Sequence, residues 1–181
     1  MNRQTLFFFL LLASFNANAA FLNGHTITSQ YYFPDTTSPA NNIGNGSYLV
    51  GPGIEVDFFY MGTLDISDNT FLITFPHVPS GGFSFPSFNG FKLSDTFGTI
   101  RDFKSVSINP ITNMVGFDLS RITVFADEIW VNWGGLQYTM DTIVSLDIKP
   151  SAVPIPAAAF MFAPALLGLM GLRRRAKNKV A

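Results

Sequence analysis

Glu55 and Asp57 are the first residues in this sequence whose type and spacing suggest chemistry. Two carboxylates can serve as the acid and the base or nucleophile of glycoside hydrolysis. The two residues stand two positions apart in "IEVDFF", so on an extended strand both side chains project from one face. The solvent face of any amphipathic strand has the same spacing. A catalytic pair and an ordinary solvated face therefore remain alternatives, and we favour the second.

Oxygen-bearing side chains near predicted turns suggest a second kind of site, for calcium. Asp65, Asp68 and Asn69 surround one turn, and Asp127 adjoins Glu128 in another segment. Carboxylate and carboxamide oxygens are ligands that calcium takes, but neither group has EF-hand spacing. Asp-Asn is also favourable in a hairpin turn. We therefore predict no metal and no cofactor, with calcium at these turns as the alternative.

The remaining residues of catalytic type offer little. His25 and His77 are the only two histidines and do not form a zinc-binding spacing. The sequence has neither a GxSxG elbow nor a phosphate-binding loop. It has no cysteine, which excludes thiolate metal sites and cysteine nucleophiles. We predict structural or surface roles for both histidines and no enzymatic activity.

The aromatic residues of "EIWVNWGGLQY" suggest a binding surface. Strand alternation places Trp130 and Asn132 on one face and Trp133 on the other. If Trp133 lies in the core, an outward indole beside an amide is a plausible site for stacking a sugar, and Tyr31 and Tyr32 are further candidates. The alternative is a central strand with both faces buried, and on sequence alone we prefer it.

The pattern predicts that short strands position these residues. Apolar and polar residues alternate in 54–59, 63–67, 105–108, 121–125 and 144–148, and helical spacing is not sustained in this part of the chain. Asp68-Asn69 separates two such runs by the shortest hairpin connection. Asn23-Gly24, Asn45-Gly46 and Asn89-Gly90 are further turn candidates. The pattern predicts an all-β protein, an antiparallel, jelly-roll-like β-sandwich.

We expect the sandwich core to use the inward positions of these runs and of their neighbours. Its predicted members are Ile54, Val56, Phe58, Leu64, Ile66, Leu72, Phe91, Leu93, Val106, Ile108, Ile122, Val124, Val131, Leu146 and Ile148. In "GFDLSR", Asp118 and Arg121 are expected to form a local ion pair or corner hydrogen bonds.

Charge is unevenly distributed along the chain. All 12 acidic residues lie between Asp35 and Asp147, and the segment from Asp35 to Lys149 holds only five of the 11 basic residues, so its net charge is −7. Nucleic-acid binding depends on basic patches that release counterions. The acidic centre therefore excludes nucleic acid as a partner.

The first residues have the layout of a secretory signal peptide. Arg3 precedes an apolar run from Leu6 to Ala13, and Ala17-Asn18-Ala19 is a small-x-small cleavage site. We predict a signal peptide at 1–19 and cleavage after Ala19, followed by a folded domain at 20–150.

The last residues form a second apolar segment. Residues 157–172 would span only about 24 Å as a helix, short of the roughly 30 Å hydrocarbon core, and a helix over about 155–172 is still short. Arg173, Arg174 and Arg175 follow and would keep the C-terminus on the cytoplasmic side. The short length also fits a signal that is cut away after insertion.

This C-terminal segment resembles the sorting signal of PEP-CTERM proteins in its Val-Pro-x-Pro-Ala variant. Val153, Pro154, Pro156 and Ala157 match the motif, and Ile155 stands where the family more often has glutamate. The two prolines hold the motif extended, as a protease cleft requires. The resemblance implies recognition by an exosortase at the inner membrane of a Gram-negative bacterium, with residues 151–181 as the sorting signal.

The segments "FNGF", "SVSINPITNMVGFDLSRI" and "IWVNWGGLQY" also resemble small PEP-CTERM proteins. This second resemblance implies only a secreted β-rich module. Our expectation is a non-enzymatic protein of the outer surface, extracellular matrix or biofilm. The alternatives are a carbohydrate-binding module for exopolysaccharide and, third, a glycoside hydrolase.

Overall fold

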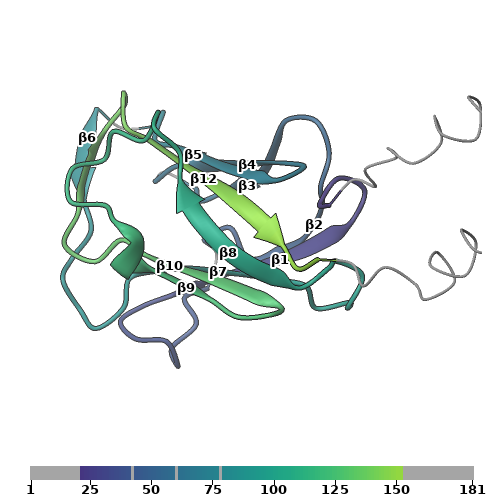
Figure 1. Cartoon of the computed structure of the whole chain (residues 1–181). Helices are drawn as coiled ribbons and strands as arrows, with labels where there is room; N and C mark the ends of the chain where they lie inside the picture. The colour runs from purple at the N-terminus through teal and green to yellow at the C-terminus, as the bar shows by residue number, and fades with distance from the viewer. Residues whose placement is uncertain (1–20, 42, 60, 78, 153–181) are drawn as a thin grey trace, which may run out of the picture. The chain divides into compact units, whose positions relative to one another are not determined.

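The computed structural model describes residues 21–41, 43–59, 61–77 and 79–152, and these form an all-β fold (Figure 1). The chain divides into two compact units, Met1–Ser151 and Ala152–Ala181, and the strands that the structure describes belong to the first. The predicted signal peptide, the predicted sorting motif from Val153 to Ala157, the predicted helix and the basic tail lie outside the described residues. Within those residues, no helix is long and apolar enough to cross a membrane.

The described residues form two five-stranded sheets and one small sheet, and every strand pairing among them is antiparallel. Sheet A has the order β2 (Gly46–Leu49), β1 (Thr26–Tyr32), β7 (Gly90–Ser94), β10 (Glu128–Asn132) and β9 (Ile122–Val124). Sheet B has the order β3 (Ile54–Asp57), β4 (Thr63–Ser67), β5 (Thr70–Thr74), β12 (Ile143–Pro150) and β8 (Phe103–Ile108). Sheet C pairs β11 (Gln137–Thr139) with β6 (Ser80–Gly82).

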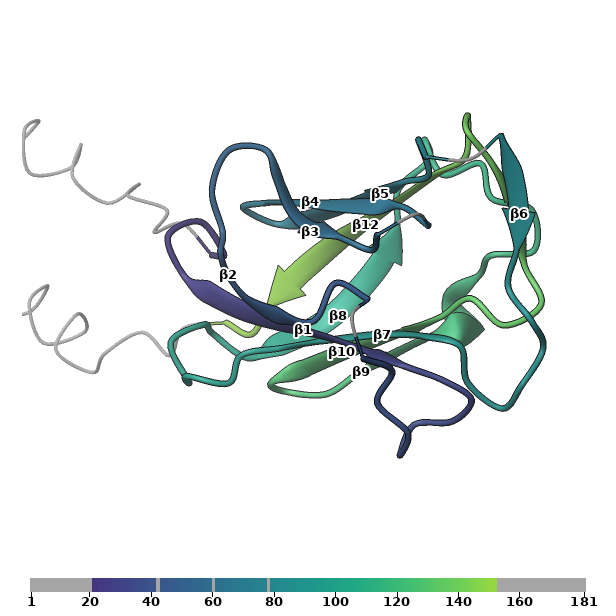
Figure 2. The same cartoon turned by 180° about the vertical axis from the view of Figure 1, so that it is seen from behind.

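The two large sheets lie as layers, with sheet C at one end between them (Figures 1 and 2). Neighbours in sequence form hairpins within a sheet, as β1 with β2 and β4 with β5 do. Elsewhere the chain passes from one large sheet to the other, between β2 and β3 and again between β7 and β8. This arrangement is consistent with the predicted β-sandwich.

Side-chain alternation explains the layers. Along β1 buried and half-buried residues alternate without a break, and β5 and β10 follow the same rule. The inward residues of both sheets form one hydrophobic cluster. One part of it is aromatic: Trp133, which is 2% exposed, packs against Phe75, Phe83, Phe91 and Phe117.

Most of the strand predictions are confirmed. The run predicted at 63–67 is β4, and Asp68-Asn69 forms a two-residue turn, since Ser67 pairs with Thr70. The runs at 105–108, 121–125 and 144–148 correspond to β8, β9 and β12 with shifted ends. The run at 54–59 ends early, because β3 stops at Asp57 and Phe59 has a φ of 61°.

The core prediction is wrong at two positions. Ile54 is 62% exposed and Leu72 is half-buried on the outer face of β5. The pairing of β3 with β4 shifts register between Ile54 and Val56, so Ile54 lies opposite Asp65 on the outer face. Val106, Ile108, Ile122 and Val124 are partly buried against the core, and the other predicted members are fully buried.

Asn89-Gly90 is not a turn, contrary to the prediction. Gly90 begins the central strand β7 and lies opposite both Tyr32 and Asn132. A side chain at Gly90 would collide with the backbone carbonyl of Val131. Glycine is required here by close strand approach.

Candidate functional site

The outer face of sheet A carries a cluster that we call the aromatic–lysine cluster: Tyr32, Phe88, Lys92, Glu128 and Trp130. Lys92 of β7 lies directly opposite Trp130 of β10, and Tyr32 ends β1 on the other side of β7. The rings of Tyr32 and Trp130 are 4.9 Å apart at 38°. Three adjacent strands therefore bring residues 32, 92 and 130 to one place.

A cation lies against both rings. The Lys92 Nζ atom is 5.3 Å from the centre of the Trp130 ring and 5.9 Å from that of Tyr32. Both distances fall within the range of a cation–π interaction. The edge of Phe88 packs against Trp130 at 5.6 Å, in a T-shaped arrangement. The indole is therefore held in place from several sides.

Glu128 uses both of its carboxylate oxygens in this cluster. Oε1 accepts a hydrogen bond from Lys92 Nζ at 2.8 Å, and Oε2 accepts one from Trp130 Nε1 at 2.9 Å. Partial burial raises the pKa of Glu128, but the hydrogen bonds from Lys92 and Trp130 and the lysine charge outweigh it and leave the pKa below its usual value. Partial burial lowers the pKa of Lys92, but Glu128 and Tyr32 outweigh it and leave the pKa raised. The cluster is therefore a neutral ion pair beside two half-buried rings.

The predicted division of the two tryptophans is confirmed. Trp133 is buried, whereas Trp130 is half-buried on the opposite face of β10. The structure differs from the preferred prediction, a strand with both faces buried. The outer residues Glu128, Trp130 and Asn132 are only half-buried.

Tyr31 does not belong to the candidate surface, and its prediction as a ligand-facing residue is wrong. Adjacent residues of a strand point to opposite faces, so Tyr31 faces the core and is 3% exposed. Its hydroxyl donates to Asn89 Oδ1 at 2.8 Å. Burial, with a smaller contribution from Tyr138, raises the pKa of Tyr31.

Asn132 lies on the predicted face but is used structurally. Its Oδ1 atom accepts hydrogen bonds from the N–H groups of Asn89 and Gly134, at 3.1 and 2.9 Å. It therefore fixes the ends of β7 and β10. Its oxygen is already occupied as an acceptor.

Glu55 and Asp57 have different partners. Glu55 accepts hydrogen bonds from the N–H of Gly51 at 2.9 Å and from the N–H of Ile66 at 2.6 Å. Asp57 lies 3.5 Å from His77, and both side chains are largely exposed. The carboxylate of Glu55 thus bridges two backbone segments at the β3 bulge instead of facing a substrate.

The predicted calcium turns also contain engaged carboxylates. Asp68 Oδ1 accepts hydrogen bonds from the N–H groups of Phe21 and Leu22, and Glu128 is paired as described. Within the described ranges, no group of three or more His, Asp or Glu side chains is arranged to hold a metal ion.

The "GFDLSR" corner forms hydrogen bonds, one of its two predicted arrangements. Asp118 caps the 3₁₀ turn Leu119–Arg121 by accepting from the N–H of Ser120 at 2.8 Å. The guanidinium of Arg121 donates to the carbonyls of Gly116 and Gly134, at 3.0 and 2.9 Å. His25 is near another polar residue, with Nδ1 3.3 Å from Thr99 Oγ1.

The sequence interpretation missed three members of the cluster as partners of Trp130: Phe88, Lys92 and Glu128. The outward position of Lys92 follows from the alternation in "GFKLS". Its register opposite Trp130 depends on pairing across 38 residues, which alternation does not specify.

Comparison with known proteins yields no match: no protein-family model, no curated protein and no solved structure is significantly similar to this chain.

Proposed function

We propose that this protein is an exported, non-enzymatic surface or matrix protein, sorted through its C-terminal segment. The observation that carries the proposal is the order of signals in the sequence: a leader, an acidic domain, a Val-Pro-Ile-Pro-Ala motif, an apolar run and a basic tail. The resemblance to PEP-CTERM proteins adds an exosortase as the processing partner and transient anchoring in the inner membrane. Release to the outer surface, matrix or biofilm of a Gram-negative bacterium follows.

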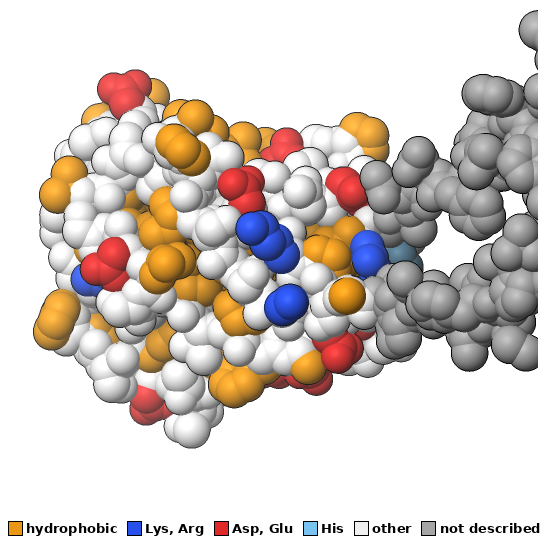
Figure 3. All heavy atoms as spheres, in the orientation of Figure 1, with side chains coloured by type: hydrophobic (Ala, Val, Ile, Leu, Met, Phe, Trp, Pro, Cys, Tyr) orange, Lys and Arg blue, Asp and Glu red, His pale blue; other side chains and the backbone are white. Residues whose placement is uncertain are grey.

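The folded part supports a structural role through its surface. Figure 3 shows exposed hydrophobic side chains interspersed with acidic and basic ones. Among the described residues, Val115 is 87% exposed and Phe85 is 85% exposed. Association with another surface would remove the apolar area of such side chains from water.

We further propose that the sandwich is jelly-roll-like, because the chain passes between its two large sheets several times.

The non-enzymatic part of the proposal is supported by the state of Glu55, one of the two predicted catalytic carboxylates. Its two oxygens accept hydrogen bonds from the backbone N–H groups of Gly51 and Ile66. Carboxylates already saturated by structural donors are poor general acids or bases.

The experiment compares the full chain with a variant lacking residues 151–181. We expect the full chain in the envelope or on the outer surface, and mass spectrometry of the mature protein should find the basic tail removed. The truncated form should accumulate in the periplasm or the medium. An intact Arg173–Ala181 tail in the envelope, or an unchanged destination after truncation, contradicts the proposal.

A second candidate function is glycan binding at the aromatic–lysine cluster. The observation that favours it is the fixed, half-buried pair of Tyr32 and Trp130 rings beside the Lys92–Glu128 pair. Aromatic faces stack against the C–H groups of sugars, and an ion pair offers both donors and acceptors to hydroxyl groups.

Binding of exopolysaccharide, measured by affinity electrophoresis, tests this function. Trp130→Ala should weaken binding about tenfold, because it removes the stacking surface. Phe97→Ala is the matched control, since Phe97 is an aromatic residue 61% exposed outside the cluster. Equal binding by both variants contradicts a glycan site here.

A further inference from the structure

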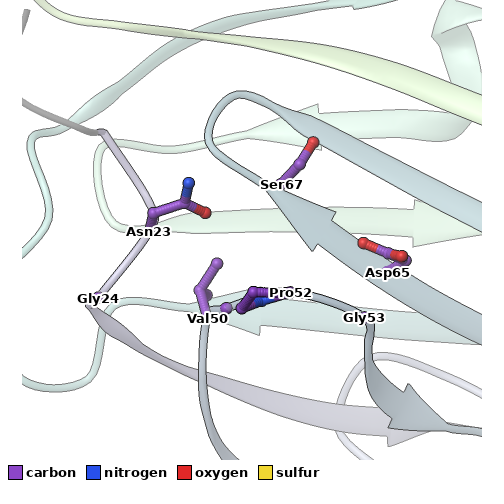
Figure 4. A pocket seen from close by; sticks show the side chains of 8 residues that line it. Asn23, Gly24, Val50, Pro52, Gly53, Asp65 and Ser67 are labelled. Carbon is purple, nitrogen blue, oxygen red and sulfur yellow. The ribbon is translucent and has the colours of Figure 1, made fainter.

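A pocket of about 520 Å³ lies where the chain passes from sheet A to sheet B (Figure 4). Its walls come from three segments: Asn23–Gly24 before β1, Val50–Gly53 between β2 and β3, and the outer residues Asp65 and Ser67 of β4. In Figure 4 the side chains of Asn23 and Asp65 face each other across the pocket, with Val50 and Pro52 below them. We call this the glycine pocket, because Gly24, Gly51 and Gly53 all line it.

The polar side chains of the glycine pocket are unpaired. Within the described part of the chain, no hydrogen bond or ion pair reaches the side chains of Asn23, Asp65 or Ser67. The neighbouring carboxylates of Glu55 and Asp68 each accept two hydrogen bonds from backbone N–H groups. Unpaired donors and acceptors that line one cavity are available to a ligand.

Backbone hydrogen bonds hold the walls of the pocket in place. The N–H of Gly24 donates to the carbonyl of Val50, and the N–H of Val50 donates to the carbonyl of His25, both at 2.9 Å. Glu55 connects Gly51 to Ile66, which stands between Asp65 and Ser67 on β4. A site with fixed walls loses little entropy when a ligand binds.

Open space surrounds the three glycines that line the pocket. A Cβ atom added at Gly24, Gly51 or Gly53 would meet no other atom within 4 Å. Together with the ring of Pro52 and the side chain of Val50, these positions present a mainly apolar surface. The pocket therefore has room for a ring-sized ligand, and pockets for small molecules begin at about 300 Å³.

The lining restricts the class of ligand. Among the residues that the structure describes, no lysine, arginine or histidine lines the pocket, and Asp65 is the one carboxylate. Anionic ligands would be repelled by Asp65, and calcium requires six to eight oxygen ligands. A carboxylate, a carboxamide and a hydroxyl above an apolar floor instead match the hydroxyl groups and C–H face of a neutral sugar ring.

We propose that the glycine pocket binds a neutral hexose unit, with ring hydroxyls hydrogen-bonded to Asp65 and Asn23 and the ring resting on Pro52. The pocket lies before the first residue of β1, whereas Tyr32 ends that seven-residue strand, so the two regions are about 20 Å apart. The proposal is therefore independent of glycan binding at the aromatic–lysine cluster and of the export route.

Isothermal titration of the full chain with glucose, mannose and galactose tests this proposal. Because the full chain includes the apolar C-terminal segment, it is kept in detergent. That detergent must not contain a sugar head group, so an amine oxide is suitable. We expect at least one hexose to bind, and Asp65→Asn to weaken that binding about tenfold or more, because it removes a charge-assisted hydrogen bond. Asp57→Asn is the matched control, since Asp57 is an exposed carboxylate on the adjacent strand β3, outside the pocket.

A second variant adds a side chain at a glycine that lines the pocket and leaves the polar groups in place. Gly51→Val should abolish hexose binding while leaving the unfolding temperature near that of the unchanged chain, because its Cβ atom enters open space. Trp130→Ala should leave this binding unchanged, which separates the pocket from the cluster.

Three outcomes would overturn the proposal. The first is no binding of any of the three hexoses at 100 mM, well above the weak affinities expected for one sugar unit. The second is equal or stronger binding of glucuronate, which contradicts the role given to Asp65. The third is binding of calcium chloride that Asp65→Asn removes while hexose binding is retained, which would make the pocket a cation site.

Discussion

On the outer face of sheet A, the carboxylate of Glu128 accepts hydrogen bonds from both Lys92 and Trp130. In the glycine pocket, the carboxylate of Asp65 has no partner among the described residues. Both residues are half-buried acids on outward positions of strands. The difference lies in what the neighbouring strands place beside them.

This contrast distinguishes a carboxylate that stabilises the fold from a carboxylate that is available to bind a ligand. A paired carboxylate gains from its hydrogen bonds and from the charge of its partner, and it leaves a neutral, fixed surface. An unpaired carboxylate in a solvent-accessible pocket contributes little to the free energy of unfolding, and its oxygens remain available as hydrogen-bond acceptors. The predictions below test the contrast in terms of the free energy of unfolding, measured by urea denaturation with tryptophan fluorescence.

The largest effect is expected for Glu55→Ala, at the wall of the glycine pocket. The substitution leaves the N–H groups of Gly51 and Ile66 without their acceptor. Each orphaned, partly buried donor costs about 1–2 kcal/mol, so we expect a loss of about 2–4 kcal/mol. Asp57→Ala is the control and should stay within about 0.5 kcal/mol. A loss below about 1 kcal/mol would show that Glu55 does not hold the wall.

A smaller effect is expected for Lys92→Met in the aromatic–lysine cluster. It removes the partner of Glu128 and the cation beside Tyr32 and Trp130. We expect a loss of about 1–2 kcal/mol, because Glu128 is then left partly buried without its counter-charge. Lys104→Met replaces an exposed lysine of β8 and should change stability by less than about 0.5 kcal/mol. Equal effects of the two variants would remove the distinction between the cluster and an ordinary surface.

The pH dependence of the cluster has a definite sign. The pKa of Glu128 is lower in the folded protein than its usual value of 4.5, so its pairing stabilises the fold above that pH and is lost as the pH falls through the folded pKa. Stability should therefore decrease between about pH 5 and pH 3. In Glu128→Gln the difference between pH 7 and pH 3 should be smaller by about 0.5–1 kcal/mol, since the group is partly exposed. An unchanged difference would argue against the pairing in solution.

The raised pKa of Lys92 gives the opposite dependence at high pH. Its pairing stabilises the fold below the usual lysine pKa of 10.5 and is lost as the pH rises through the folded pKa.

The smallest effect is expected for Asp65→Asn. Because no described group donates to Asp65, its loss should change the free energy of unfolding by less than about 0.5 kcal/mol. A loss above about 1 kcal/mol would mean that Asp65 has a structural partner, and the contrast between the two regions would then fail.

Much of the fold could be predicted because its signals are local. Alternation identified β4 with its correct ends, and Asp68-Asn69 identified the hairpin that follows it. Alternation also placed Trp130 and Trp133 on opposite faces, and the structure shows that Trp133 is the buried one. Ile54 was misplaced because the β3 bulge reverses the faces, and a bulge has no signature in an alternating run.

The candidate sites could be predicted only in part. Trp130 could be named because it faces outward if Trp133 lies in the core, whereas Tyr31 and Tyr32 were named together and neither was assigned to a face. The pairing of Lys92 with Glu128, residues 36 apart in sequence, could not. The glycine pocket combines three distant segments, and each of them looks like an ordinary turn or strand in the sequence.

The sequence by itself determined the all-β character, the acidic central segment, the strands that alternate and the placement of the two tryptophans on opposite faces. These properties depend on composition and on the two-residue repeat of a strand, which act within a few residues. Only the tertiary structure decided which carboxylates are paired and which remain open. Pairing depends on strand register and on loops that meet across the fold, and residues far apart in the chain come together there only when the two sheets pack.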